Sequence, residues 1–185
     1  MHGRNVTIIF LQKEDKHRVR LTVGGNIIDY PGNVSTPTVD LITAKILFNS
    51  VVSTPNSRFM CTDDKDLSFN TPMECYEYTR LPIAIITQEI IDQYDIMKRF
   101  HNVHAYTDIR KGMYGLTQSG CITNKSLTNH LAKYGYNSTC LTPGLWEHGT
   151  HPITFSLVTD KFGVKYVGRW HAQHLVSTPE DLYRV

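Results

Sequence analysis

Hydrophobic and polar positions along the chain predict several short strands. Apolar and polar residues alternate at residues 6–11 and 19–23, the pattern of a half-buried strand. Shorter aromatic or mixed runs predict strands at residues 58–62, 76–80 and 104–109. Two further apolar runs, at residues 153–158 and 162–167, are separated by three residues and predict a hairpin. The chain is therefore expected to contain an antiparallel sheet.

Apolar residues at helical spacing predict four helices, at residues 37–52, after Thr87, around residues 127–134 and from about Trp170. The first follows Thr36-Pro37, a capping residue and a proline at the first helical position. Gly135 stands where the third needs a left-handed C-terminal residue, and Pro179 is expected to interrupt or restart the fourth. Strands and helices in this order predict an α+β fold, with helices covering one face of an antiparallel sheet.

Composition adds limits on domain number and partners. The 185 residues, 41% of them hydrophobic, suffice for one good core but are short for two independent domains. The formal charge of +2 means that any nucleic acid must be met by a local basic patch. The four cysteines form no CxxC pair, and no apolar run reaches the roughly 20 residues of a membrane span. We expect one compact, soluble unit.

Two aspartates stand at the ends of predicted strands and are candidates for metal chemistry. Asp63 closes the apolar run of residues 59–62, and Asp160 closes that of residues 155–158. Carboxylates that meet at the ends of adjacent strands suit magnesium, a hard cation that prefers oxygen ligands and leaves room for phosphate oxygens and water. Strand-end aspartates are also common turn residues. The spacing alone therefore leaves both interpretations open.

Histidines give a weaker candidate. His-x-x-His occurs three times, at His101/His104, His148/His151 and His171/His174, and such a pair on a helix can bind zinc. Only the last pair falls in a predicted helix, and no acidic or cysteine ligand is evident nearby. We therefore interpret these side chains as surface or partly buried imidazoles. The sequence has no G-x-S-x-G, P-loop or G-x-G-x-x-G motif, so it gives no support to serine hydrolase, NTPase or dinucleotide-binding functions.

Several ordered motifs resemble the reverse transcriptase of copia-type LTR retrotransposons over about residues 18–175. They are Asp63-x-Lys65, Asn70-Thr71-Pro72, the stretch Arg110 to Gly120, and Val158-Thr159-Asp160 in a hairpin. The most specific is the YGLxQ block at Tyr114 to Gln118. The resemblance implies a single reverse-transcriptase-like unit over residues 1–185 with a right-hand polymerase fold. Residues 1–58 and 73–110 would be fingers-like, and residues 59–72 and 111–185 palm-like.

The same resemblance implies RNA-directed DNA polymerase chemistry with Mg²⁺. Asp63 and Asp160 would be the catalytic metal ligands, and the backbone carbonyl of Asp64 would assist. The thumb and RNase H portions are expected beyond Val185, and a partner chain that supplies the thumb is left open. Retrotransposon polymerases work in cytoplasmic particles, so the cytoplasm is the expected location, with the nucleus as an alternative.

The resemblance also implies contacts to an incoming dNTP and to an RNA/DNA template-primer. Arg18 and Arg20 would grip the triphosphate, because guanidinium groups donate bidentately to phosphate oxygens. Gln118 would approach the sugar of the nucleotide. Arg110 and Lys111 would meet the template backbone in a salt-sensitive contact. Alternatively, Arg18 and Arg20 are solvated charges on a strand. Arg110 and Lys111 are alternatively an exposed strand end.

Departures from the family pattern predict impaired activity. Lys161 replaces the second aspartate of the family's hairpin, which puts a positive charge beside the expected metal. Its flexible stem could instead turn to solvent and leave Asp63 and Asp160 as a weaker site. Ser68 stands where the family has an aromatic residue that excludes the 2′-hydroxyl, and Thr117 and Ser119 also differ. The alternative function is a non-catalytic module that binds nucleic acid or a protein.

Overall fold

The computed structural model describes residues 4–10, 19–25, 28–64 and 67–183. The chain divides into two compact units where the sequence predicted one. Unit 1 contains residues 1–34 and 68–119, and unit 2 contains residues 35–67 and 120–185. The fingers-like and palm-like segments expected from the sequence alternate in the same order, but residues 35–58 group with unit 2 and residues 68–72 and 111–119 with unit 1. Within the described residues, no helix is both long and apolar enough to cross a membrane.

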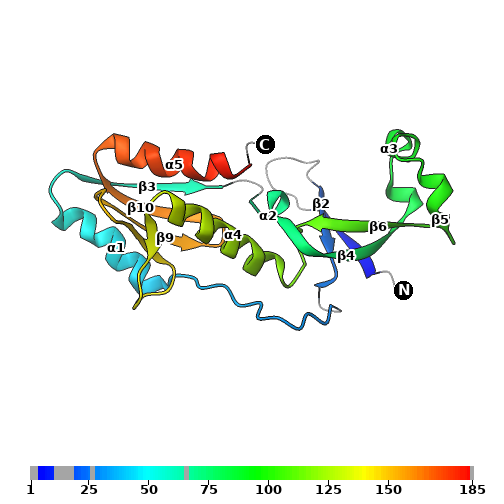
Figure 1. The fold of residues 1–185 in the computed structure, drawn as a ribbon, viewed down its shortest axis with the longest axis horizontal. Coiled ribbons are helices and arrows are strands. Elements are labelled where there is room, and N and C mark those ends of the chain that lie inside the picture. Colours follow the sequence, from blue (N-terminus) through cyan, green and yellow to red (C-terminus); the bar gives the residue numbers. More distant parts are fainter. Residues whose placement is uncertain (1–3, 11–18, 26–27, 65–66, 184–185) are drawn as a thin grey trace. The chain divides into compact units, whose positions relative to one another are not determined.

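Unit 1 is built on a five-stranded sheet in the order β2-β1-β4-β6-β5 (Figure 1). The strands are β1 (Arg4–Phe10), β2 (Val19–Val23), β4 (Pro72–Pro82), β5 (Phe100–His101) and β6 (His104–Lys111). Neighbouring strands are antiparallel except β1 and β4, which are parallel. Short helical segments follow β4, namely η2 (Ile83–Ile85), α3 (Gln88–Gln93) and η3 (Ile96–Arg99). The one-turn helix α2 (Leu67–Asn70) precedes β4.

The YGLxQ block has a backbone role in unit 1. Gly115 has φ +90°, and a Cβ atom there would lie 1.9 Å from the carbonyl oxygen of Val23. The Val23 N–H donates to the Tyr114 carbonyl oxygen at 2.9 Å. Only glycine permits both the left-handed conformation and this close approach of two chain segments. The glycine of the block is therefore required by the fold of unit 1 itself.

Unit 2 has a fully antiparallel five-stranded sheet in the order β3-β10-β9-β8-β7. The strands are β3 (Ser57–Asp63), β7 (Tyr136–Ser138), β8 (Leu145–His148), β9 (Ile153–Val158) and β10 (Lys161–Val167). Three helices pack on it, α1 (Leu41–Ser53), α4 (Ser119–Lys133) and α5 (Arg169–Tyr183). The α+β class with an antiparallel sheet and the β9–β10 hairpin are confirmed.

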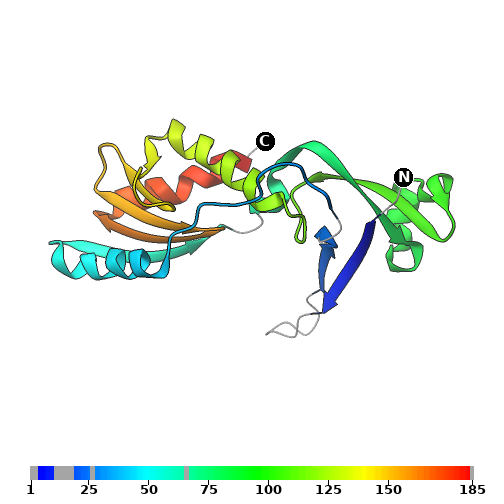
Figure 2. The same ribbon diagram turned by 90° about the horizontal axis from the view of Figure 1, so that it is seen from below.

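Helices cover both faces of the unit 2 sheet, whereas the sequence predicted one covered face. On one face, Leu127 and Leu131 of α4 and Leu175 of α5 pack with alternate residues of β9 and β10 into the main core. On the opposite face lies α1 (Figure 2). Phe48 of α1 meets Phe59 of β3 edge-on, with ring centroids 5.0 Å apart. The expectation that helices cover only one face of the sheet was wrong, because α1 packs on the face opposite to α4 and α5.

Two helix ends differ from the sequence-based expectation. Helix α1 begins at Leu41 rather than Pro37, because Asp40 caps it and accepts the N–H groups of Ile42 and Thr43. Helix α5 continues through Pro179, which was expected to interrupt or restart it. Tertiary contacts outweigh the proline here, since the Thr178 carbonyl accepts a hydrogen bond from His130 of α4 at 2.8 Å. This contact with α4 holds the helix at the residue that precedes the proline.

Candidate functional site

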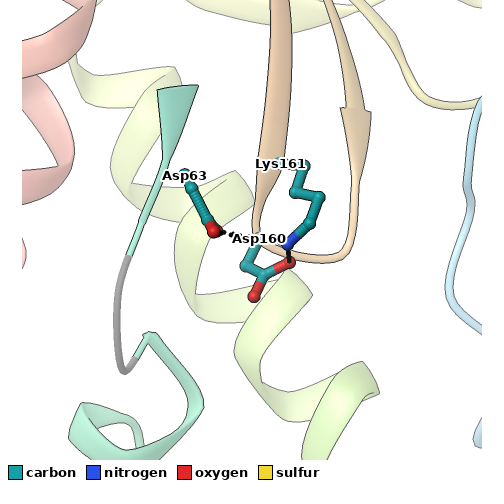
Figure 3. A network of polar contacts seen from close by, with 3 residues as sticks. All are labelled: Asp63, Asp160 and Lys161. Carbon is teal, nitrogen blue, oxygen red and sulfur yellow. Dashed lines mark hydrogen bonds and ion pairs between the residues drawn. The ribbon is translucent and has the colours of Figure 1, made fainter. Parts of the chain in front are cut away.

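Two carboxylates from distant parts of the chain meet at one end of the unit 2 sheet (Figure 3). Asp63 is the last residue of β3 and pairs directly with Lys161, the first residue of β10. Asp160 lies in the two-residue turn between β9 and β10. The N–H of Asp64 donates to the carbonyl oxygen of Asp160 at 2.9 Å and ties the end of β3 to this turn. The two aspartates are called the acid pair below.

The side chain of Lys161 bridges the acid pair. Its Nζ lies 3.4 Å from both carboxylate oxygens of Asp63 and 3.2 Å from Oδ1 of Asp160 (Figure 3). The carboxylates are therefore within reach of one shared cation, and that cation is an ammonium group. Of the two orientations considered from sequence, the structure has the lysine turned toward the acids rather than out to solvent.

The charge arrangement stabilises the protonated lysine. The hydrogen bond and charge of Asp160, followed by those of Asp63, raise the pKa of Lys161 above its usual value. The ammonium is thus fully protonated at neutral pH. Its side chain is 64% exposed, against 54% for Asp63 and 33% for Asp160, so water screens the cluster. A divalent ion at this position has to displace the ammonium, and exposure leaves the ammonium free to move.

A small cavity adjoins the acid pair within unit 2. It has a volume of about 100 Å³ and is lined by residues from β3, β10 and α5, namely Thr62, Asp63, Asp64, Phe162, Leu175, Val176 and Pro179. Pockets that hold drug-sized or nucleotide-sized ligands are typically about 300–1,000 Å³. This cavity is large enough for an ion with a few water molecules and too small for a nucleotide.

The turn that carries Asp160 is strained. Thr159 has φ +59°, a left-handed conformation that β-branched residues rarely adopt. Such a residue costs on the order of 1–3 kcal/mol and persists only where its surroundings enforce it. Here the paired strands β9 and β10 enforce it, because Lys161 is in register with Val158 on either side of the two-residue turn. The same strand pairing holds Asp160 beside Asp63 at the sheet end.

The sequence-predicted nucleotide contacts are divided between the two units. Arg18 lies outside the described residues, and Arg20 lies in β2 opposite Ile9 of β1. Gln118 is 1% exposed. Its amide donates to Glu77 at 3.0 Å and accepts from Thr117 at 3.1 Å. Burial and two hydrogen bonds thus hold Gln118 inside unit 1, and its approach to a sugar stays a prediction.

Ser68 belongs to α2, and its carbonyl oxygen accepts the N–H of Thr71 at 3.2 Å. Ser68 and Gln118 are part of unit 1, whereas Asp63, Asp64 and Asp160 are part of unit 2. The predicted metal ligands therefore lie within unit 2. The predicted nucleotide contacts Ser68 and Gln118 lie within unit 1.

Arg110 and Lys111 end strand β6, and both are exposed. The Arg110 guanidinium is 3.1 Å from a carboxylate oxygen of Asp108 and lies over the Tyr76 ring, 5.4 Å from its centroid. Tyr76 belongs to a row of side chains that sequence reasoning missed. Tyr76, Tyr78 and Arg80 alternate along one side of β4, and Arg80 is opposite Tyr106 of β6. The aromatic–basic face is defined as Tyr76, Tyr78, Arg80, Tyr106 and Arg110. The alternation of side chains along residues 76–80 was the signal in the sequence that could have revealed it.

The chain matches no protein-family model, no curated protein and no solved structure in comparisons with all three. The acid pair and the aromatic–basic face are therefore the features of the chain that bear on its function.

Proposed function

We propose that the chain is a reverse-transcriptase-like fragment with fingers-like and palm-like parts, in which nucleotidyl transfer is impaired or silent. The observation that carries this proposal is the sharing of one lysine ammonium by Asp63 and Asp160. Strand-end carboxylates brought together from remote segments are what a two-metal polymerase requires. An internal cation between them gives a reason for lost activity that does not require loss of the fold.

The acid pair fits a hard cation by ligand type. Asp63 and Asp160 would hold Mg²⁺ through carboxylate oxygens, with the carbonyl of Asp64 as a further oxygen. Bound there, Mg²⁺ would supply charge neutralisation on phosphate oxygens and activation of a primer hydroxyl. The carboxylate oxygens of Asp63 and Asp160 already contact the Lys161 ammonium. The site therefore favours this singly charged group over a divalent ion. The acid pair, occupied by the Lys161 ammonium, would therefore bind Mg²⁺ only weakly.

Magnesium-dependent primer extension tests this proposal. We expect no detectable extension by the unmodified chain and measurable extension by Lys161→Asp, which removes the competing ammonium and adds a carboxylate. Lys165→Asp makes the same charge change four residues along β10, where the lysine donates to Ser50 of α1 instead. This control is expected to stay inactive. Robust DNA synthesis by the unmodified chain would contradict the impairment.

A second candidate function is nucleic-acid binding without catalysis, and the aromatic–basic face favours it. Tyr76 and Tyr78 are each 48% exposed and Tyr106 is 44% exposed. Exposed aromatic rings on a sheet can stack on bases, typically at about 1–3 kcal/mol per base. The exposed Arg110 guanidinium lies over the Tyr76 ring and is placed to meet a phosphate beside these rings, and the exposed Lys111 follows it at the end of β6.

Binding of a fluorescent RNA/DNA duplex with a single-stranded overhang checks this candidate. We expect affinity to fall steeply as salt rises from about 50 to 200 mM, because phosphate contacts release counterions. Arg110→Gln with Lys111→Gln should weaken binding and flatten the salt dependence, and Tyr76→Ala should weaken it at all salt concentrations. Lys98→Gln removes an exposed cation paired with Asp95 elsewhere in unit 1 and serves as the control. Failure to retain the duplex even at low salt would rule out this function.

A further inference from the structure

Four histidines from two distant His-x-x-His pairs converge in unit 2. His148 ends β8 and His151 lies in the loop before β9, while His171 and His174 project from α5. The rings of His148 and His151 stack at 3.9 Å between centroids and 5° between planes. His174 approaches both nearly edge-on, at 5.7 Å and 5.0 Å. Within the described residues, one ring nitrogen from each of these three lies within 4.8 Å of the other two.

We propose that His148, His151 and His174 bind one zinc-class transition-metal ion and thereby clamp α5 to the β8–β9 loop. In a tetrahedral zinc site with bonds of about 2.0–2.1 Å, ligand nitrogens are about 3.3 Å apart. The three nitrogens thus need to close by up to about 1.5 Å, and the stacked rings of His148 and His151 need to rotate out of their parallel arrangement so that both can point a nitrogen at one ion. Three imidazoles select zinc, copper or nickel over magnesium or calcium. The site is independent of the acid pair.

Hydrogen bonds already orient two of the three ligands. His174 Nδ1 lies 2.8 Å from the hydroxyl of Tyr136, and His148 Nε2 lies 2.9 Å from the carbonyl oxygen of Tyr134. Metal-binding histidines usually donate their second N–H to such a partner, which fixes the tautomer and directs the other nitrogen to the metal. For His148 this leaves Nδ1, which now accepts the N–H groups of Thr150 and His151 at 3.0 Å each. A metal would replace those two bonds.

The third ligand carries an unexplained polar atom. His151 Nδ1 is buried and has no hydrogen-bond partner among the described residues; His171 Nδ1 shares this property, but His171 is not one of the three histidines whose ring nitrogens lie within 4.8 Å of one another. A buried polar atom without a partner costs free energy, and a bound ion is one way to satisfy it.

Zinc titration of the untagged full chain tests the site, with calorimetry for affinity and thermal unfolding for stability. We expect one Zn²⁺ per chain and a Tm increase of about 5–10 °C at a free zinc concentration about 100 times Kd. Co²⁺ should give the visible absorption of a tetrahedral nitrogen site. Trp170, whose ring lies 5.1 Å from that of His151, should report binding by a change in fluorescence.

Substitutions identify the ligands. His151→Ala removes a side chain that makes no hydrogen bond, so it should fold normally and weaken zinc binding at least ten-fold. His174→Ala should weaken zinc binding to the same extent, and it also removes the hydrogen bond to the hydroxyl of the buried Tyr136. His171→Ala removes the fourth histidine of the cluster, whose ring lies 4.8 Å from that of His151, and should leave affinity within about two-fold. Asp63→Asn should also leave zinc affinity unchanged and so separates this site from the acid pair.

Three results would overturn the proposal. The first is no zinc binding by the unmodified chain at about 100 μM, a concentration far above the Kd of known structural sites. The second is undiminished affinity in both His151→Ala and His174→Ala. The third is a loss in His171→Ala as large as that in His151→Ala, which would refute the assigned ligand set.

Discussion

Lys161→Asp is expected to raise the affinity of the chain for Mn²⁺, used as an oxygen-preferring substitute for Mg²⁺, by at least about a hundred-fold. The substitution changes the charge beside the ion by two units at a distance of about 5 Å, an effect of that size even at the dielectric constant of water. It also frees Asp63 and Asp160 from the ammonium that now lies 3.4 Å and 3.2 Å from them. Mn²⁺ titration followed by electron paramagnetic resonance measures the change.

Two variants separate the causes of this gain. Lys161→Met removes the ammonium without adding a carboxylate, so its affinity should lie between those of the unmodified chain and Lys161→Asp. Lys165→Asp adds the same negative charge farther along β10 and should change affinity only a few-fold. An equal gain in Lys165→Asp would show that the overall charge, rather than the acid pair, controls cation binding.

Leu157→Ala is expected to remove about 2–5 kcal/mol from the free energy of unfolding, as large-to-small substitutions in packed cores do. Leu157 is 1% exposed and belongs to the core beneath the turn that carries Asp160. Because domains of this size are commonly stable by only about 5–15 kcal/mol, the loss should shift the urea midpoint strongly. Urea unfolding followed by circular dichroism measures it.

Leu141→Ala is the matched control for this prediction. It deletes the same atoms from a side chain that is 96% exposed, so its effect should stay within about 0.5 kcal/mol. Comparable losses in the two variants would mean that the core of unit 2 is not organised around β9 as described.

Much of the fold could be predicted because local pattern and tertiary structure agree. The β9–β10 hairpin and strand β3 follow from apolar runs bounded by turn residues, and Gly135 has the expected left-handed φ of +85°. The short strands β7 and β8 were missed because three or four residues give too little periodicity to recognise. The extension of β4 to residues 72–82 was missed because its register shifts between Pro72 and Glu77.

The candidate site could be predicted only in part. The encounter of Asp63 with Asp160 was expected, since both close apolar strands, and the structure brings them together. The direction of the Lys161 side chain could not be predicted, because a flexible four-carbon side chain leaves no signal in the sequence. The burial of Gln118 depends on Glu77, a partner remote in sequence. Likewise, the histidine pairs were visible in the sequence, but their convergence depends on where α5 packs.

The pairing of β3 with β10 delays formation of the unit 2 sheet during synthesis on the ribosome. Asp63 leaves the ribosome 98 residues before Lys161, its partner in register. At a translation rate of about 5–20 residues per second, the nascent β3 waits roughly 5–20 s for its neighbour. Throughout that interval its backbone groups are available to other strands. Nascent-chain chaperones should therefore bind this segment first, and slower translation between residues 64 and 160 should lower the yield of folded protein.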